Sequence, residues 1–129
     1  EMSMELPVPG ILESPFGVFE SKIFSYKKQK IEEKKYTKWF DYDKIKNSPC
    51  VRTRRQGDYL TVNSEGGRKK LNRIFIDEKI PAEMRDRLPV VAVGSEILWI
   101  PGGRMNEKYK ITSTTGRVLE LHYQGGALA

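Results

Sequence analysis

The stretch Val90–Ile100, "VVAVGSEILWI", carries the clearest structural signal in this chain of 129 residues. Two apolar runs, rich in β-branched residues and ending in Trp99 and Ile100, flank the pair Gly94-Ser95. A two-residue loop that begins with glycine suits a type II′ turn, because the twist of that turn matches the twist of the strands on either side. The stretch therefore predicts a buried β-hairpin, with Trp99 in its apolar half.

Further strands are predicted on both sides of this hairpin. Alternating or β-rich runs that end at turn residues are typical of strands. Such runs lie at 4–8, 16–26, 36–40, 51–54, 59–62 and 117–123. In the last of them, Leu119, Leu121 and Tyr123 share one face. The charged run 27–35 is expected to be a loop, and a turn or a short helical piece is expected at 43–47.

A helix is predicted over 68–78. At about 100° per residue, Leu71, Ile74 and Phe75 fall on one face, whereas Ile76 lies off this apolar stripe. Cations stand nearly opposite the stripe or beside it: Lys69, Lys70 and Arg73. A second short helix is predicted at 81–87, since proline suits a first helical turn and a further proline ends the segment. The expected fold class is therefore mostly β (α+β), with one or two short helices.

The charge of the chain favours a polyanionic partner. There are 23 Lys and Arg residues against 17 Asp and Glu residues, which gives a net charge of +6 and a pI of about 9.4. The cations gather in three clusters, at 27–38, 52–55 and 68–73. Within the second cluster, Arg52 and Arg54 are expected to share one basic face of a strand. Clustered cations of this kind are typical of nucleic-acid-binding domains.

The cysteine content and the hydropathy of the sequence indicate in which cellular compartment the protein is expected. Cys50 is the only cysteine, so an internal disulfide and a cysteine-rich zinc site are both excluded. No run reaches the roughly 18 apolar residues of a membrane span, and no apolar signal segment opens the sequence. We therefore expect a cytoplasmic protein without a membrane partner. Because the first residue is Glu1, we expect the chain to be part of a longer protein.

Catalytic chemistry is not evident in the residues. His122 is the only histidine, and neither it nor Cys50 has a second group that would form a nucleophile–base pair. The stretch "EGGRKK" at 65–70 lacks the spacing of a phosphate-binding Walker loop. Its Gly66-Gly67 pair before a predicted helix is compatible with local phosphate binding at the helix N-terminus, or with a flexible loop. Both interpretations stay open at this point.

Three motifs in a fixed order resemble one known family. They are "VRTRRQGDY" at 51–59, "GGRKKLNRIFIDEKIPAEMRDRLPVV" at 66–91 and "EILWIPGGRMNEKYKIT" at 96–112. Together they closely resemble the C-terminal domain of bacterial tRNA(Ile)-lysidine synthetase. The resemblance covers 36–123, which we expect to form this domain. Residues 1–35 are expected to form N-terminal strands and a charged loop, and 124–129 a tail.

This resemblance implies a function for a longer parent enzyme. The parent would use ATP to ligate lysine to the wobble cytidine of the isoleucine tRNA with a CAU anticodon. ATP and Mg would bind to an N-terminal domain that this chain does not contain, so the chain itself would hold no cofactor or catalytic residue. The resemblance further implies a layered, β-sandwich-like fold similar to a domain of the phenylalanyl-tRNA synthetase β chain. The expected partners are tRNA(Ile) and the remaining domains of the parent.

The implied role of the chain is tRNA recognition, through phosphate and 2′-hydroxyl contacts that Lys and Arg make well. The expected RNA-binding residues are Arg52, Arg54, Arg55, Arg68, Lys69, Lys70, Arg73 and Arg104. One alternative is a structural or interaction domain, which packs on the rest of its enzyme or dimerises through its apolar residues. An autonomous enzyme is a third hypothesis, which the missing catalytic signals disfavour.

Overall fold

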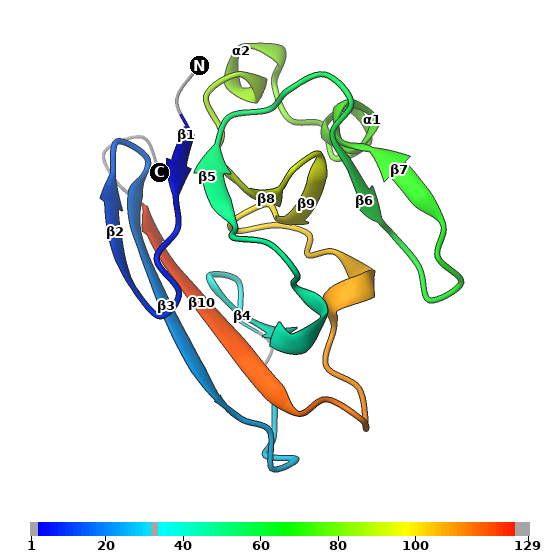
Figure 1. Cartoon of the computed structure of the whole chain (residues 1–129). Helices are drawn as coiled ribbons and strands as arrows, with labels where there is room; N and C mark the ends of the chain where they lie inside the picture. Colours follow the sequence, from blue (N-terminus) through cyan, green and yellow to red (C-terminus); the bar gives the residue numbers. More distant parts are fainter. Residues whose placement is uncertain (1–2, 32–33, 126–129) are drawn as a thin grey trace. The chain divides into compact units, whose positions relative to one another are not determined.

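The computed structural model describes residues 3–31 and 34–125, and its chain divides into two compact units. The first unit contains Ser3–Glu5 and Pro49–Lys108, and the second contains Leu6–Ser48 and the chain from Tyr109 onward. Each unit is built around one β-sheet, of six strands in the first and of four strands in the second (Figure 1).

The six-stranded sheet of the first unit is centred on the predicted hairpin. In spatial order its strands are β1 (Ser3–Glu5), β5 (Cys50–Arg52), β8 (Val90–Val93), β9 (Glu96–Trp99), β6 (Tyr59–Thr61) and β7 (Arg68–Lys70). All neighbours are antiparallel except β6 and β9, which pair in parallel at Tyr59 and Glu96. Gly94 opens the turn between β8 and β9 with a φ of 59°, which glycine adopts without strain. The hairpin prediction is confirmed.

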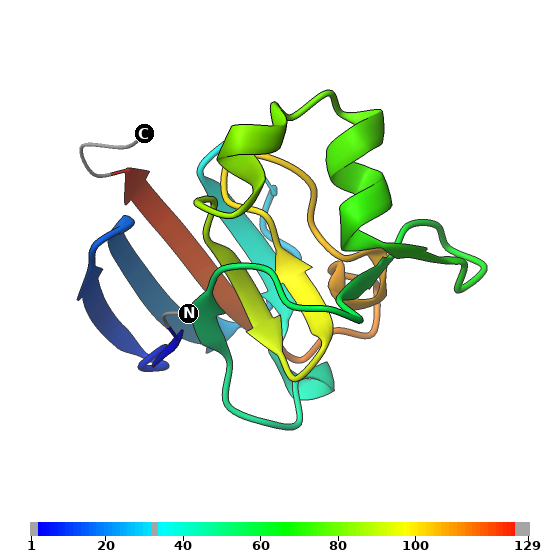
Figure 2. The same ribbon diagram turned by 90° about the horizontal axis from the view of Figure 1, so that it is seen from above.

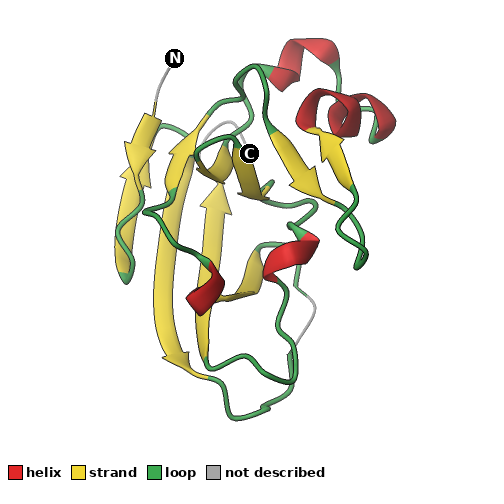
Figure 3. Cartoon of the chain, turned by 45° about the vertical axis from the view of Figure 1, so that its right-hand side comes forward, coloured by secondary structure: helices red, strands yellow, loops and turns green. Residues whose placement is uncertain are grey.

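Two short helices lie at one end of this sheet (Figure 3). In α1 (Leu71–Asp77) the predicted apolar face is buried, whereas Ile76 is 49% exposed. The second helix, α2 (Ala82–Arg85), is shorter than the predicted 81–87. A core joins the helix to the hairpin: it comprises Leu60, Leu71, Ile74, Phe75, Val90, Ala92, Ile97 and Ile100.

The predicted start of the first helix is wrong. Residues Arg68–Lys70 form β7, which pairs with β6. The backbone N–H of Leu71 then donates to the carbonyl of Asp58 at 2.9 Å, so the chain leaves the ladder only at this residue. A helical wheel drawn from the sequence cannot detect a partner strand, and it therefore extended the helix by one turn.

The second unit is a four-stranded antiparallel sheet. Its strands, in spatial order, are β2 (Gly10–Ser14), β3 (Gly17–Ser25), β10 (Arg117–Gly125) and β4 (Thr37–Asp41). Figure 2 shows the long strands β3 and β10 side by side. A short 3₁₀ turn, η1 (Tyr42–Lys44), follows β4. A second, η2 (Glu107–Tyr109), lies where the chain passes from the first unit to the second, with seven residues between it and β10. Strand β2 was not predicted from the sequence.

The two faces of β10 differ as its alternation predicts. Leu119, Leu121 and Tyr123 are buried with Phe19 and Phe40 from the neighbouring strands, whereas His122 on the other face is exposed. Across both units the described residues form strands far more often than helices, which confirms the predicted fold class. No helix in the described part of the chain is long and apolar enough to cross a membrane.

Candidate nucleic-acid interface

Helix α1 is the element around which most of the predicted cations gather. At its first turn, the Arg54 guanidinium donates to the Asn72 side chain at 3.1 Å. The same guanidinium donates to Asp86, just beyond α2, at 2.8 Å. Arg54 therefore ties the loop after β5 to both helices, and it presents a partly exposed guanidinium between them.

At the other end of α1, two of the predicted cations share one carboxylate. The Lys69 ammonium pairs with Asp77, and the Arg73 Nε lies 3.2 Å from the same side chain. The hydrogen bond from Lys69, helped by the positive charge of Arg73, lowers the pKa of Asp77 below its ordinary value. Asp77 is therefore ionised at neutral pH, and it partly neutralises this cationic pair.

Arg68 and Lys70 form a separate group on β7. Because side chains alternate along a strand, these two share one face, and Lys69 points to the other. The Arg68 guanidinium lies 4.7 Å from the centre of the Tyr59 ring, and Tyr59 is the cross-strand partner of Lys70. Arg68, Lys69 and Lys70 therefore lie on two faces of a strand. The sequence had predicted that these cations would lie along one helix.

Arg104 completes the group of cations. Its Nε lies 3.8 Å from the carboxylate of Glu78, the residue directly after α1. We call the following set, which includes cations on both faces of β7, the α1 surface: Arg54, Arg55, Arg68, Lys69, Lys70, Arg73 and Arg104. Three carboxylates pair with four of these cations: Asp86 with Arg54, Asp77 with Lys69 and Arg73, and Glu78 with Arg104. The seven cations outnumber these three carboxylates, which suits a polyanion.

Arg52 does not belong to this surface, and the expected basic strand face is wrong. Its side chain is only 1% exposed. The guanidinium makes two hydrogen bonds to the carboxylate of Asp58, at 2.8 and 2.9 Å, and donates to the Gly94 carbonyl at 2.8 Å. A buried arginine needs such partners to offset the loss of hydration. Arg52 therefore has a structural role in the first unit.

This buried pair also fixes the loop that carries two cations of the α1 surface. Asp58 accepts a further hydrogen bond, at 2.7 Å, from the backbone N–H of Arg55. The Asp58 carbonyl accepts the bond from Leu71 at the start of α1. The pair thus connects β5, the loop 53–57, the β8–β9 turn and α1. Sequence reasoning missed Asp58, because "QGD" reads as an ordinary turn and nothing in it signals burial.

The Gly66-Gly67 pair lies in the turn between β6 and β7, and not at a helix N-terminus. The side chain of Asn63 organises this turn by accepting from the backbone N–H groups of Glu65 and Gly67, at 3.1 and 2.9 Å. A Cβ added to Gly67 would lie 2.6 Å from the Asn63 amide, so a larger residue there would displace the side chain that organises the turn. The hypothesis of a phosphate cradle formed by a helix N-terminus is therefore wrong.

The two residues that were considered for catalysis and set aside, His122 and Cys50, belong to different units. The His122 ring bonds the Thr37 hydroxyl at 2.7 Å on the exposed face of the four-stranded sheet, whereas Cys50 packs partly buried against the core of the first unit. No three His, Cys, Asp or Glu residues in the described part of the chain are grouped as metal ligands would be.

Comparison with known proteins points to one family. The family model described as the TilS substrate C-terminal domain matches residues 50–121. Over 88 residues the chain is 50% identical to the tRNA(Ile)-lysidine synthase of Caldanaerobacter subterraneus subsp. tengcongensis, which covers 68% of this chain and 19% of that protein. Over 123 residues it is 37% identical to the enzyme of the same name from Geobacillus kaustophilus, which covers 93% of this chain and 26% of that protein.

A solved structure extends this similarity to the fold. The crystal structure of a TilS C-terminal domain matches with a TM-score of 0.80 and 33% sequence identity, over 96% of each chain. The curated relatives are much longer, and the chain spans about a fifth to a quarter of their length.

Proposed function

Because this chain belongs to the family of TilS substrate C-terminal domains, we propose that it is the tRNA-recognition domain of a tRNA(Ile)-lysidine synthase. The parent would be a cytoplasmic ligase that uses ATP to join lysine to the wobble cytidine of tRNA(Ile). ATP and Mg would be bound by another domain of that parent. The contribution of this chain would be to hold the tRNA.

The observation that carries this proposal is the composition of the α1 surface. Its cations outnumber the carboxylates that the structure pairs with them, and they lie beside an aromatic ring, Tyr59, against which the Arg68 guanidinium packs. Ammonium and guanidinium groups bind RNA phosphates, and fixed hydrogen bonds keep several of these cations in place before the RNA arrives. The buried Arg52–Asp58 pair holds the loop of Arg54 and Arg55 in position.

The alternative of a purely structural or interaction domain loses its main sequence argument. That argument rested on the apolar excess of the hairpin and of Trp39 and Phe40. Ile97, Leu98, Trp99 and Phe40 are all 0% exposed, so they are not available to a second protein. Of the residues in that argument, Trp39 is partly exposed.

We expect tRNA binding with a strong dependence on salt. If the α1 surface neutralises about four phosphates, the logarithm of the association constant should fall with the logarithm of salt concentration at a slope of about −3. A titration of the chain with tRNA(Ile) at 50 and 200 mM salt measures this slope. A slope near zero, or no binding at the lower concentration, would favour the interaction domain.

Replacing Asp77 with asparagine is expected to tighten tRNA binding by a few fold. The substitution removes the carboxylate that Lys69 and Arg73 share, so the α1 surface gains one net positive charge and two available cations. Stability should change little, since ion pairs near the surface contribute little to it. Filter-binding assays at fixed salt would measure the change.

Asp43→Asn is the matched control for that variant. Asp43 is also an exposed carboxylate whose pKa is lowered by a neighbouring cation, here Arg117, but it belongs to the second unit and not to the α1 surface. The two variants change the net charge equally. Equal tightening by both would show that tRNA responds to overall charge and not to the α1 surface.

A further inference from the structure

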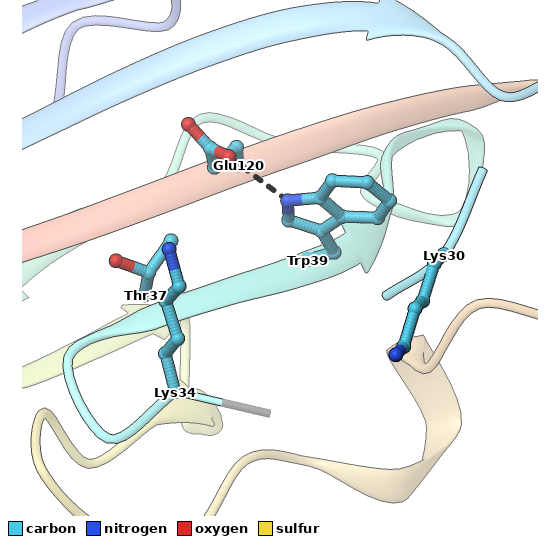
Figure 4. A pocket seen from close by; sticks show the side chains of 5 residues that line it. All are labelled: Lys30, Lys34, Thr37, Trp39 and Glu120. Atoms are coloured by element: carbon cyan, nitrogen blue, oxygen red, sulfur yellow. Dashed lines mark hydrogen bonds between the residues drawn. The ribbon is translucent and has the colours of Figure 1, made fainter. Parts of the chain in front are cut away.

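A pocket of about 210 Å³ opens on the second unit, and the proposed function does not use it. Its lining comes from β4, β10 and the loop that precedes β4: Lys30, Lys34, Thr37, Trp39 and Glu120. Figure 4 shows Lys30 and Lys34 on either side of the Trp39 indole, with Glu120 beside the ring. Trp39 and Glu120 are 81 residues apart in sequence, and they meet as cross-strand partners of β4 and β10.

Fixed contacts hold the floor of this pocket. The Trp39 indole donates its Nε1–H to Glu120 at 2.9 Å, and Phe24 packs against the indole edge-on, with ring centres 5.0 Å apart. Thr37 is held by its hydrogen bond with His122 at 2.7 Å. The aromatic ring and the carboxylate are therefore oriented in the absence of a ligand, and both remain partly exposed.

The chemistry of the lining selects one kind of ligand. An aromatic ring offers a stacking partner for a nucleobase, and flanking ammonium groups offer contacts for the phosphates on either side of that base. A carboxylate accepts hydrogen bonds from an exocyclic amine, as it does from the amine of cytosine. The volume is below the roughly 300 Å³ of sites for drug-sized ligands, so it suits a single base.

We propose that this pocket binds one unpaired, amine-bearing nucleobase of the RNA, with its flanking phosphates on Lys30 and Lys34. The inference rests on the proposed function, because that function supplies the RNA partner. In this arrangement the base stacks on Trp39 and its amine donates to the carboxylate of Glu120. Uracil fits less well, since it has no exocyclic amine and its one free ring N–H lies between two carbonyl oxygens that the carboxylate repels.

The test uses single-stranded oligoribonucleotides of four identical bases. Trp99 is fully buried, so quenching of the intrinsic fluorescence by an added oligonucleotide reports on Trp39, the only other tryptophan. We expect tetramers of adenosine and of cytidine to quench this fluorescence and to bind about tenfold more tightly than the uridine tetramer. Quenching by none of the three, or equal affinity for all three, would overturn the proposal.

Two variants locate the contacts. Glu120→Gln keeps an oxygen that accepts the hydrogen bond from Trp39, but it removes the charge and adds an N–H donor. The preference of the pocket for the adenosine and cytidine tetramers over the uridine tetramer should therefore fall to about twofold or less. Lys30→Glu should weaken all three tetramers by a similar factor of about tenfold, because it acts on phosphates. Fluorescence anisotropy of labelled tetramers measures the affinity of each variant for each of the three sequences. Unchanged discrimination in Glu120→Gln would contradict the role of the carboxylate.

Measuring tRNA binding and tetramer binding separately distinguishes a failure of the pocket proposal from a failure of the proposed function. Lys69→Glu with Arg73→Glu should reduce the affinity for tRNA and leave tetramer binding unchanged, since the α1 surface and the pocket belong to different units. Full tRNA binding without tetramer binding would overturn only the pocket. Tetramer binding without tRNA binding would overturn only the proposed function.

Discussion

Replacing Asp58 with alanine is expected to destabilise the chain by about 3–5 kcal/mol, the usual cost of removing one partner of a buried ion pair. The substitution would leave the guanidinium of Arg52 buried and stripped of its two hydrogen bonds to a carboxylate, at 2.8 and 2.9 Å. It would also remove the acceptor of the Arg55 N–H. Equilibrium urea unfolding measures the loss.

The exposed pair of Arg54 and Asp86 provides the control for that experiment. It has the same chemistry and a similar distance of 2.8 Å, but the Asp86 side chain is 78% exposed. Exposed ion pairs contribute about 0–1 kcal/mol, so Asp86→Ala should change stability little. If Asp58→Ala cost no more than Asp86→Ala, the buried pair would not hold the loop as we infer.

As a separate variant, Trp99→Ala is expected to lower the free energy of unfolding by about 3–5 kcal/mol, since truncating a buried aromatic side chain leaves a cavity. Trp99 is fully buried in β9, at the centre of the six-stranded sheet. The variant should lose thermal stability, and tRNA affinity should be retained at temperatures where it is folded. An unchanged melting temperature with weakened tRNA binding would mean that Trp99 contacts RNA.

Ile76→Ala is the control for Trp99→Ala, because it also removes apolar side-chain atoms but at an exposed position. Ile76 belongs to the same unit and is 49% exposed, so its truncation should change the unfolding free energy by less than about 0.5 kcal/mol. A large cost at Ile76 would show that the side chain is packed in solution, contrary to its position off the apolar stripe of α1.

Much of the fold follows from local sequence patterns. The Gly94-Ser95 hairpin, the buried face of α1 and the alternation along β10 all arise from neighbouring residues, and all three predictions are confirmed. The start of α1 was wrong because its first predicted turn belongs to β7, whose partner β6 lies several residues earlier. Pairing between strands is a tertiary event that a helical period cannot reveal.

The candidate site was less accessible to sequence reasoning. Clustered cations indicated a polyanion, but charge alone does not separate a surface arginine from a buried one. Arg52 and Arg54 look equivalent in "VRTRR", although Arg52 is paired internally with Asp58 and Arg54 lies between two helices. The pocket of Trp39 and Glu120 had no local signal, since its walls meet only across β4 and β10.

The central claim is that tRNA binds to the α1 surface, and one comparison of dissociation constants tests it most directly. Arg68→Glu with Lys70→Glu reverses two charges on the face beside Tyr59, while Lys27→Glu with Lys46→Glu makes the same change in net charge on the second unit. All four side chains are exposed, so folding should be little affected. We expect the first variant to bind tRNA(Ile) at least about tenfold more weakly than the second. Equal losses in the two variants would contradict the claim.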